Sequence, residues 1–331
     1  MPAAPVWPLV AVLGPTASGK SELALSLAGA FDGEIVNCDS LQLYRGLDIG
    51  TAKTPAAARR GIPHHLIDIL DPDQECDAGH YAELARGALE EIRARGRLPV
   101  LAGGTGFYAR ALLDGLAPGP RRDPEVRQRL QRLEQRRVGA LHRLLACWDP
   151  PTAARIGAQD VQKLVRALEI CLLAGKPASQ VFAAAAPPLA GYACLKLVLN
   201  PDREALRERI RERTREMFRQ GLVEEVRGLL ADRVGARIKP LEAIGYKESA
   251  AVIEGRISAE QAVELTFYAT CQYAKRQTTW FRRERGAVVI SGFGQEFPTQ
   301  LQAARIVREF LENLHPHADS PATKRPAGRI D

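Results

Sequence analysis

The first third of the chain alternates between short apolar runs and segments whose apolar residues recur with helical spacing. Apolar runs bounded by glycine or polar residues predict buried strands, and the periodic segments between them predict crossover helices. The expected strands are residues 8–13, 34–37 and 98–102, and the expected helices are residues 20–30, residues 81–95 and a segment after Gly103-Gly104. This order of strand, helix and strand predicts a parallel sheet with helices on its faces.

The pattern changes near residues 117–120. Between residues 121 and 186 the apolar spacing is helical throughout, and residues 121–143 are rich in Arg. A strand pattern returns at residues 192–199, and the remainder is mostly helical with a further strand expected at 287–290. We therefore expect an all-helical insertion within the α/β core. The expected parts are a first core segment 1–118, the insertion 119–190, a second core segment 191–314 and a disordered polar tail 315–331.

Composition and charge describe an ordinary globular chain with an excess of basic residues. Of the 331 residues, 46% are hydrophobic and 26% are charged, and the net charge of +7 comes almost entirely from Arg. This excess fits a phosphate-bearing partner and fits an arginine-biased proteome equally well. The six cysteines form no C-x-x-C pair, so we expect neither a zinc site nor a disulfide framework. We find no signal-peptide pattern and no membrane-length apolar run, and we expect a cytoplasmic protein.

A phosphate-binding motif follows the first expected strand and precedes the first expected helix. Residues 14–21, GPTASGKS, fit the pattern G-x-x-x-x-G-K-[ST] of a P-loop, and we call them the P-loop here. Its backbone N–H groups and the helix N-terminus can hold phosphate oxygens, Lys20 can reach the terminal phosphates, and the Ser21 hydroxyl can bind Mg²⁺. The fold class that we expect is therefore a P-loop NTPase-like parallel sheet flanked by helices. The motif indicates phosphate without distinguishing a kinase, a GTPase or a transferase.

Two further motifs follow the next expected strands. Asp39 begins the run DSLQLY, where a carboxylate could bind Mg²⁺, act as a base or simply cap a helix. The run GGTGFY at residues 103–108 permits close approach of a ligand and offers the Thr105 hydroxyl, although an ordinary strand-to-helix turn has the same composition. The carboxyl ends of parallel strands meet at one sheet edge, so both motifs are expected to face the P-loop.

Taken together, the motifs resemble the bacterial tRNA dimethylallyltransferase family over residues 10–283. The segments that carry the resemblance are GPTASGKS, DSLQLYRGLDIGTAK, PHHLIDI, AGGTGFYARAL, VRALEI, GLVEEV, AIGYKE and YAKRQTTWFR, in this order. The resemblance implies transfer of a dimethylallyl group from dimethylallyl diphosphate to the exocyclic amine of adenosine 37 in the anticodon loop of tRNA. It also implies Mg²⁺ as cofactor. One departure is Cys271, where the family often has Arg, so one RNA contact could be missing.

The resemblance also assigns roles to residues. It implies that Asp39 is the general base, that Thr105 lies beside the reacting centre, and that one arginine of residues 209–215 binds the diphosphate, for which Arg213 is our choice. The residues implied to bind the diphosphate are Gly14, Thr16, Ala17, Ser18, Gly19, Lys20 and Ser21, with Ser21 also binding the metal. The residues implied to contact the tRNA anticodon stem-loop are Asp39, Ser40, Leu41, Gln42, Thr105, Arg127, Gln162, Lys163, Leu164, Val165 and Arg166.

Three alternatives remain open on the sequence. An adenylate isopentenyltransferase would share the P-loop core but prenylate a free nucleotide, which leaves the basic helical insertion unexplained. A small-molecule kinase lacks support from a second Mg²⁺-binding aspartate motif or a nucleotide-base motif. A non-catalytic RNA-binding protein would leave Lys20, Ser21, Asp39 and Thr105 without a purpose. The sequence does not reveal the oligomeric state, and a monomer is the default expectation.

Overall fold

The computed structural model describes residues 6–116, 119–183, 188–231 and 238–314, so the expected disordered tail lies outside the described residues. The chain divides into two compact units, one formed by residues up to Ala109 and from Gly191, the other by Arg110–Ala190. None of the described helices is long and apolar enough to cross a membrane.

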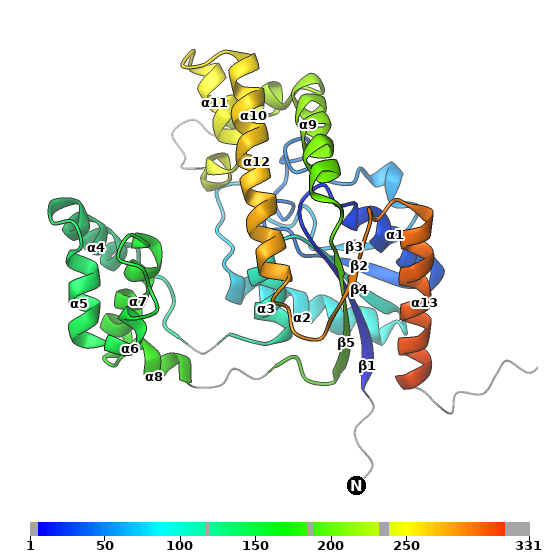
Figure 1. Ribbon diagram of the computed structural model, residues 1–331, viewed down its shortest axis with the longest axis horizontal. Helices are drawn as coiled ribbons and strands as arrows, with labels where there is room; N and C mark the ends of the chain where they lie inside the picture. Colours follow the sequence, from blue (N-terminus) through cyan, green and yellow to red (C-terminus); the bar gives the residue numbers. More distant parts are fainter. Residues whose placement is uncertain (1–5, 117–118, 184–187, 232–237, 315–331) are drawn as a thin grey trace, which may run out of the picture. The chain divides into compact units, whose positions relative to one another are not determined.

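The described residues of the first unit form a six-stranded sheet in the order β3-β2-β4-β1-β5-β6 (Figure 1). Neighbouring strands run parallel, and the central strand β1 pairs with β4 on one side and with β5 on the other. The strands are β1 (Trp7–Leu13), β2 (Gly33–Asn37), β3 (His64–His65), β4 (Leu98–Gly103), β5 (Tyr192–Leu199) and β6 (Ala287–Ile290). The expected parallel α/β sheet is confirmed, and the two-residue edge strand β3 is an addition to it.

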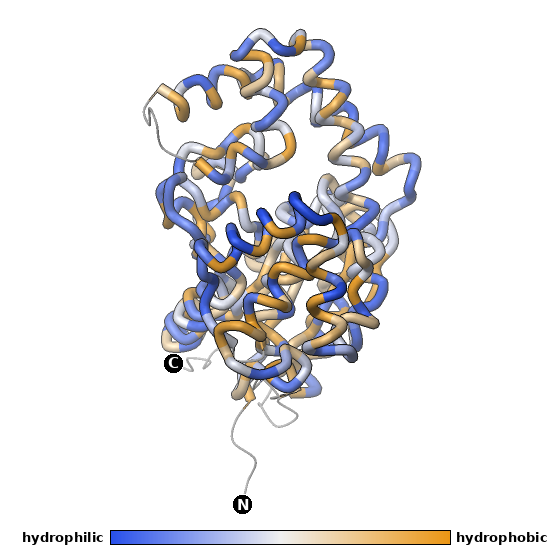
Figure 2. The backbone as a smooth tube through the Cα atoms, turned by 90° about the vertical axis from the view of Figure 1, so that its left-hand side faces the viewer, coloured by the Kyte–Doolittle hydropathy of each residue, from blue (hydrophilic) through white to orange (hydrophobic). Residues whose placement is uncertain are grey.

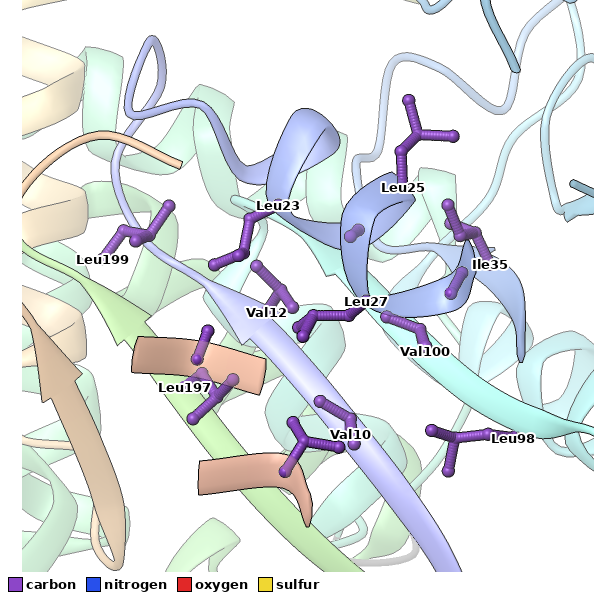
Figure 3. Packing of buried hydrophobic residues seen from close by; sticks show 14 of the residues in the cluster. Val10, Val12, Leu23, Leu25, Leu27, Ile35, Leu98, Val100, Leu197 and Leu199 are labelled. Carbon is purple, nitrogen blue, oxygen red and sulfur yellow. The ribbon is translucent and has the colours of Figure 1, made fainter. Parts of the chain in front are cut away.

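Helices cover both faces of this sheet. The helices α1 (Lys20–Ala30) and α13 (Phe297–Leu314) pack on one face, where Leu23 and Leu27 meet Val10, Val12 and Val100 in a core closed to solvent (Figure 3). The helix α2 (Ala78–Ala94) packs against β2 and β4 from the other face (Figure 1). Burying a side chain of this size stabilises the fold by about 1.5–3 kcal/mol.

The rest of the first unit is mainly helical, as expected for residues 202–314. Its helices are α9 (Arg203–Arg219), α10 (Leu222–Ala231), α11 (Tyr246–Ile253) and α12 (Ala259–Phe281), with short 3₁₀ segments at Ala56–Arg59 and Lys239–Glu242. These helices pack on one another, and α9 follows the carboxyl end of β5 (Figure 1). Hydrophobic and hydrophilic positions alternate along the helical segments (Figure 2), as is usual where a helix buries one face.

The second unit is all-helical in its described residues, which confirms the helical pattern expected there. It comprises α4 (Pro124–Arg136), α5 (Ala140–Trp148), α6 (Pro150–Ala153), α7 (Val161–Ala174) and α8 (Ala178–Ala183), and α3 (Gly106–Leu113) spans the boundary between the units. Leu141, Leu145, Leu164 and Leu168 form a core of its own. The Asp123 side chain caps α4 by accepting hydrogen bonds from the backbone N–H groups of residues 125 and 126.

Candidate active site

The P-loop connects β1 to α1 at the carboxyl edge of the sheet. Gly19 precedes the helix with a φ of 84°, and a Cβ there would lie 2.4 Å from Oε1 of Gln295 and 2.7 Å from the Gly294 nitrogen. The Gly294 N–H donates a hydrogen bond to the Ser18 carbonyl at 2.9 Å, so the segment after β6 packs directly on the loop. Position 19 therefore tolerates only glycine, and the loop leads into the positive end of the α1 dipole.

Lys20 folds back over the P-loop. Its Nζ donates a hydrogen bond to the Pro15 carbonyl at 2.7 Å. The pKa of the Lys20 amine is lowered to about 8, mainly by burial; the negative charge of Asp39 opposes this shift, and the positive charge of Arg213 adds to it. The site therefore holds a lysine whose charged form is poorly solvated, which an incoming phosphate oxygen would stabilise.

Asp39 follows β2 and faces the same site. Asn37 holds its backbone, because Asn37 Oδ1 accepts from the Asp39 N–H at 3.0 Å and Asn37 Nδ2 donates to the Asp39 carbonyl at 3.0 Å. The carboxylate oxygen Oδ1 accepts from the Leu41 N–H at 3.0 Å. Asp39 thus caps a turn with one oxygen, and its charge acts on both Lys20 and Arg213. The capping and the functional interpretations of this aspartate are compatible.

Thr105 connects the Asp39 turn to the end of β4. Its Oγ1 accepts a hydrogen bond from the Ser40 N–H at 3.1 Å, and its own N–H donates to the Cys38 carbonyl at 3.1 Å. A Cβ on Gly103 would lie 2.1 Å from the same carbonyl, so the two strand ends touch at backbone distance. The second and third sequence motifs therefore form one continuous surface beside the P-loop.

Arg213 lies on α9 and reaches the P-loop from the other side. Its Nη1 donates to Thr16 Oγ1 at 3.4 Å, and its Nη2 donates to the Thr51 carbonyl at 3.5 Å. Burial lowers the pKa of Arg213, and the charge of Asp39 counteracts this effect. The Arg209 and Arg211 side chains instead lie over the rings of Phe293 and Phe267 at 4.9 and 4.2 Å. The geometry thus favours Arg213 among the neighbouring arginines as the anion-binding residue.

Two residues of α12 complete the site, and sequence reasoning did not single them out. Gln277 is buried; its Oε1 accepts from the Thr16 N–H at 2.8 Å, and its Nε2 donates to the Gly104 carbonyl at 2.8 Å. Burial and the charge of Asp39 raise the pKa of Tyr273, and a hydrogen bond with Thr105 counteracts them. Both residues lie in the quoted run YAKRQTTWFR, so that motif contained the only sequence signal for them.

Two of the expected RNA-binding residues of the second unit, Arg127 and Arg166, meet at one buried carboxylate. Glu169 is fully buried; its Oε2 accepts from Arg127 at 3.1 Å and from Arg166 at 2.7 Å, and its Oε1 accepts from the Asp123 N–H at 2.8 Å. Gln162 and Lys163 are exposed on α7, whereas Leu164 and Val165 are buried in the core of the unit. Only the exposed and half-buried members of this segment present side chains to a partner.

Comparisons with known proteins agree on one family. The sequence model of the family described as IPP transferase matches residues 42–284. A tRNA dimethylallyltransferase of Solibacter usitatus is 55% identical over 307 residues, which cover 92% of this chain and 99% of the relative. Among solved structures, the full-length tRNA isopentenylpyrophosphate transferase of Bacillus halodurans has a TM-score of 0.69 at 36% identity and covers 93% of this chain and 98% of its own. A eukaryotic dimethylallyltransferase acting on tRNA has a TM-score of 0.80 at 27% identity, over 93% of this chain and 80% of its own.

Proposed function

The chain belongs to the IPP transferase family of tRNA dimethylallyltransferases, and from this we propose that it prenylates adenosine 37 in the anticodon loop of tRNA. It is a prenyltransferase that acts on tRNA. The donor in this proposal is dimethylallyl diphosphate, and the acceptor is the exocyclic amine of the adenine. The observation that carries the proposal is the convergence of Lys20, Asp39 and Arg213 on the P-loop.

The arrangement of these charges suits departure of a diphosphate. Lys20, Arg213, the P-loop N–H groups and the α1 N-terminus form a positive cradle in which negative charge can grow on the leaving oxygen. Since the Lys20 and Arg213 side chains are partly buried, their electrostatic effect on a bound anion is larger than it would be at the surface. The proposed diphosphate-binding residues are therefore those of the P-loop together with Arg213.

The acceptor side of the reaction needs a proton acceptor, and we propose Asp39. As the adenine nitrogen attacks the allylic carbon, a new C–N bond forms and the bond from that carbon to the diphosphate oxygen breaks. The electron pair of the broken bond leaves with the diphosphate, and the proton released by the nitrogen passes to the Asp39 carboxylate. An adenine that is stacked within the anticodon loop is out of reach of Asp39, so the nucleotide must be flipped out of the stack to enter the site. We propose that the flipped-out nucleotide contacts Asp39, Ser40, Gln42 and Thr105.

Mg²⁺ is the proposed cofactor. The Ser21 hydroxyl is exposed in the first turn of α1, beside Lys20, and a hydroxyl at this place fits an ion that binds mainly through phosphate oxygens and water. When bound, the ion would neutralise charge on the departing diphosphate. Ser21 is the residue of this chain that we propose as its ligand.

We further propose that the enzyme acts as a monomer in the cytoplasm. In this proposal the first unit of one chain supplies the catalytic residues Asp39, Thr105 and Arg213 without a residue from a second copy. The described cysteines are free thiols, as is usual in a reducing compartment.

The acceptor position can be tested by analysis of the product. Unmodified tRNA would be incubated with the protein, dimethylallyl diphosphate and Mg²⁺, then digested to fragments and to nucleosides for mass spectrometry. We expect the prenyl group on the exocyclic amine of adenosine 37. A prenyl group on another nucleotide, or its absence from all tRNA fragments, would refute the proposal.

A further inference from the structure

A carboxylate outside the P-loop holds three successive backbone N–H groups of one loop. Oε2 of Glu225, on α10, accepts from the Asp48 N–H at 3.1 Å and from the Ile49 N–H at 2.7 Å, and its Oε1 accepts from the Gly50 N–H at 3.3 Å. Consecutive N–H groups that converge in this way form an anion-binding concavity. Here the anion is a side chain of the protein itself, so the loop 48–50 is shaped around Glu225.

A buried tyrosine fixes the position of this carboxylate. The Tyr246 hydroxyl donates a hydrogen bond to Glu225 Oε1 at 2.7 Å, and Tyr246 is fully buried. Burial and the charge of Glu225 raise the pKa of Tyr246, so its hydroxyl stays protonated and remains a donor. The ring also packs on the loop, because a Cβ on Gly50 would lie 2.4 Å from it. The carboxylate therefore has four donors, supplied by the loop and by α11.

The loop leads directly to a carbonyl that touches the active site. The Thr51 carbonyl accepts from Gln42 Nε2 at 3.2 Å and from Arg213 Nη2 at 3.5 Å. The other end of the Arg213 guanidinium reaches Thr16 of the P-loop at 3.4 Å. Thr51 itself is buried, and its hydroxyl donates to the Leu47 carbonyl at 2.7 Å. The direction of the Thr51 carbonyl thus depends on the loop that Glu225 holds.

We propose that Glu225 is a positioning residue for the transfer reaction. It fixes the loop 48–50 so that the Thr51 carbonyl turns Arg213 towards the diphosphate and Gln42 towards the tRNA. One carboxylate thereby orients side chains for both substrates without touching either. The proposal rests on the proposed function for the roles of Arg213 and Gln42.

The primary test is Glu225→Gln, which keeps the size of the side chain and replaces one acceptor oxygen by a donor NH₂. Glu224→Gln is the matched control, because Glu224 precedes Glu225 on the same helix turn, is 65% exposed and pairs with Arg227 at 3.5 Å. The probe is inorganic diphosphate with Mg²⁺, titrated by calorimetry. We expect Glu225→Gln to weaken diphosphate binding about tenfold and Glu224→Gln to leave it unchanged.

A double-mutant cycle with Arg213→Ala separates positioning from general damage to the fold. If Glu225 acts through Arg213, Glu225→Gln should change diphosphate affinity by less than about twofold in the Arg213→Ala protein. In Glu225→Gln the Michaelis constant for tRNA should rise above that of the wild-type protein, because Gln42 is misplaced as well as Arg213. An undiminished tenfold loss in both backgrounds, or no loss in Glu225→Gln alone, would overturn the proposal.

Tyr246→Phe gives a second route if Glu225→Gln fails to fold. This variant removes only the hydroxyl that donates to Glu225, and we expect about threefold weaker diphosphate binding that again disappears in the Arg213→Ala background. Equal losses in both backgrounds would contradict the proposal. The readout is independent of prenyl transfer. If the variants show this coupling but the wild-type protein does not prenylate tRNA, the proposed function alone is refuted. If the wild-type protein prenylates tRNA but the variants show no coupling, the inference alone is refuted.

Discussion

Lys20, Asp39 and Arg213 bring two positive charges and one negative charge to the same small volume at the P-loop. The negative charge of Asp39 favours the protonated forms of Lys20 and Arg213, whereas their burial disfavours them. A bound diphosphate would add negative charge beside both cations and so relieve the cost of their burial. The site therefore carries a positive charge that only a bound anion balances. Substitution of single residues can measure how strongly this charge favours diphosphate binding.

Diphosphate affinity should depend on pH through Lys20. Its amine, with a pKa of about 8, is charged below that pH and neutral above it. Binding favours the charged amine, so affinity should be nearly constant between pH 7 and 8 and fall by up to about tenfold per pH unit above that range. Titration with an unreactive analogue of dimethylallyl diphosphate would measure the slope. An arginine at this position stays charged over this range, so Lys20→Arg should abolish the fall in affinity with pH. An equal slope in that variant would contradict the assignment of this pH dependence to Lys20.

Gln277 offers a second test at the residue scale. Gln277→Ala removes both bonds of the amide and leaves the Thr16 N–H and the Gly104 carbonyl without this partner. Each loss should cost about 1–3 kcal/mol, so we expect at least about tenfold lower kcat/KM and a lower melting temperature. Glu264→Gln, an exposed change on the same helix, is the control. Unchanged kcat/KM in Gln277→Ala would show that the P-loop does not depend on this contact.

At the scale of elements, most of the core could be predicted from the sequence. The segments β5, β6 and α1 have the bounds expected from their apolar patterns, because each is an apolar run or a periodic segment ended by Gly, Pro or polar residues. Strand β3 was not predicted, because its two residues, His64 and His65, are too few to show a period. It forms by pairing with β2, a tertiary contact that no local pattern reveals.

The candidate site was predictable only where a motif is local. The P-loop, Asp39 and Thr105 each follow a strand, and parallel strands bring their ends together. Gln277 lies 261 residues from Thr16 along the chain, and its role depends on how α12 packs. The same holds for Glu225, whose neighbour Glu224 is chemically identical in sequence but exposed in the fold. Their burial in the fold distinguishes Glu225 from Glu224, which the apolar periodicity of the sequence did not reveal.

The helix α7 carries a prediction for the second unit. Glu169→Gln removes a buried charge that joins Arg127, Arg166 and the start of α4, and it should destabilise this unit by about 1–3 kcal/mol. Affinity for tRNA should fall several-fold, whereas diphosphate affinity should stay unchanged. Thermal unfolding and filter binding would measure both effects. Glu125→Gln is the control, since Glu125 is 83% exposed and pairs with Arg129 at the surface. Weaker diphosphate binding in Glu169→Gln would contradict this division of roles.

For the whole molecule, our proposal assigns one chemical task to each of the two units. The first unit contains the P-loop, Asp39, Thr105 and Arg213, which form the proposed transfer site, and the second contains the basic helices proposed to bind RNA phosphates. The net charge of +7 fits a macromolecular anion as acceptor. A free nucleotide as acceptor would give the second unit no role. The nature of the acceptor is therefore the central claim of this account.

The most direct test is transfer of labelled dimethylallyl diphosphate, with Mg²⁺, to unmodified bacterial tRNA and in parallel to AMP, with wild-type protein and Asp39→Ala. We predict label in tRNA only, and a loss of at least about a hundredfold in rate for Asp39→Ala, because general-base catalysis typically contributes at least that factor. Label in AMP, or ATP consumption without label in either acceptor, would contradict the account.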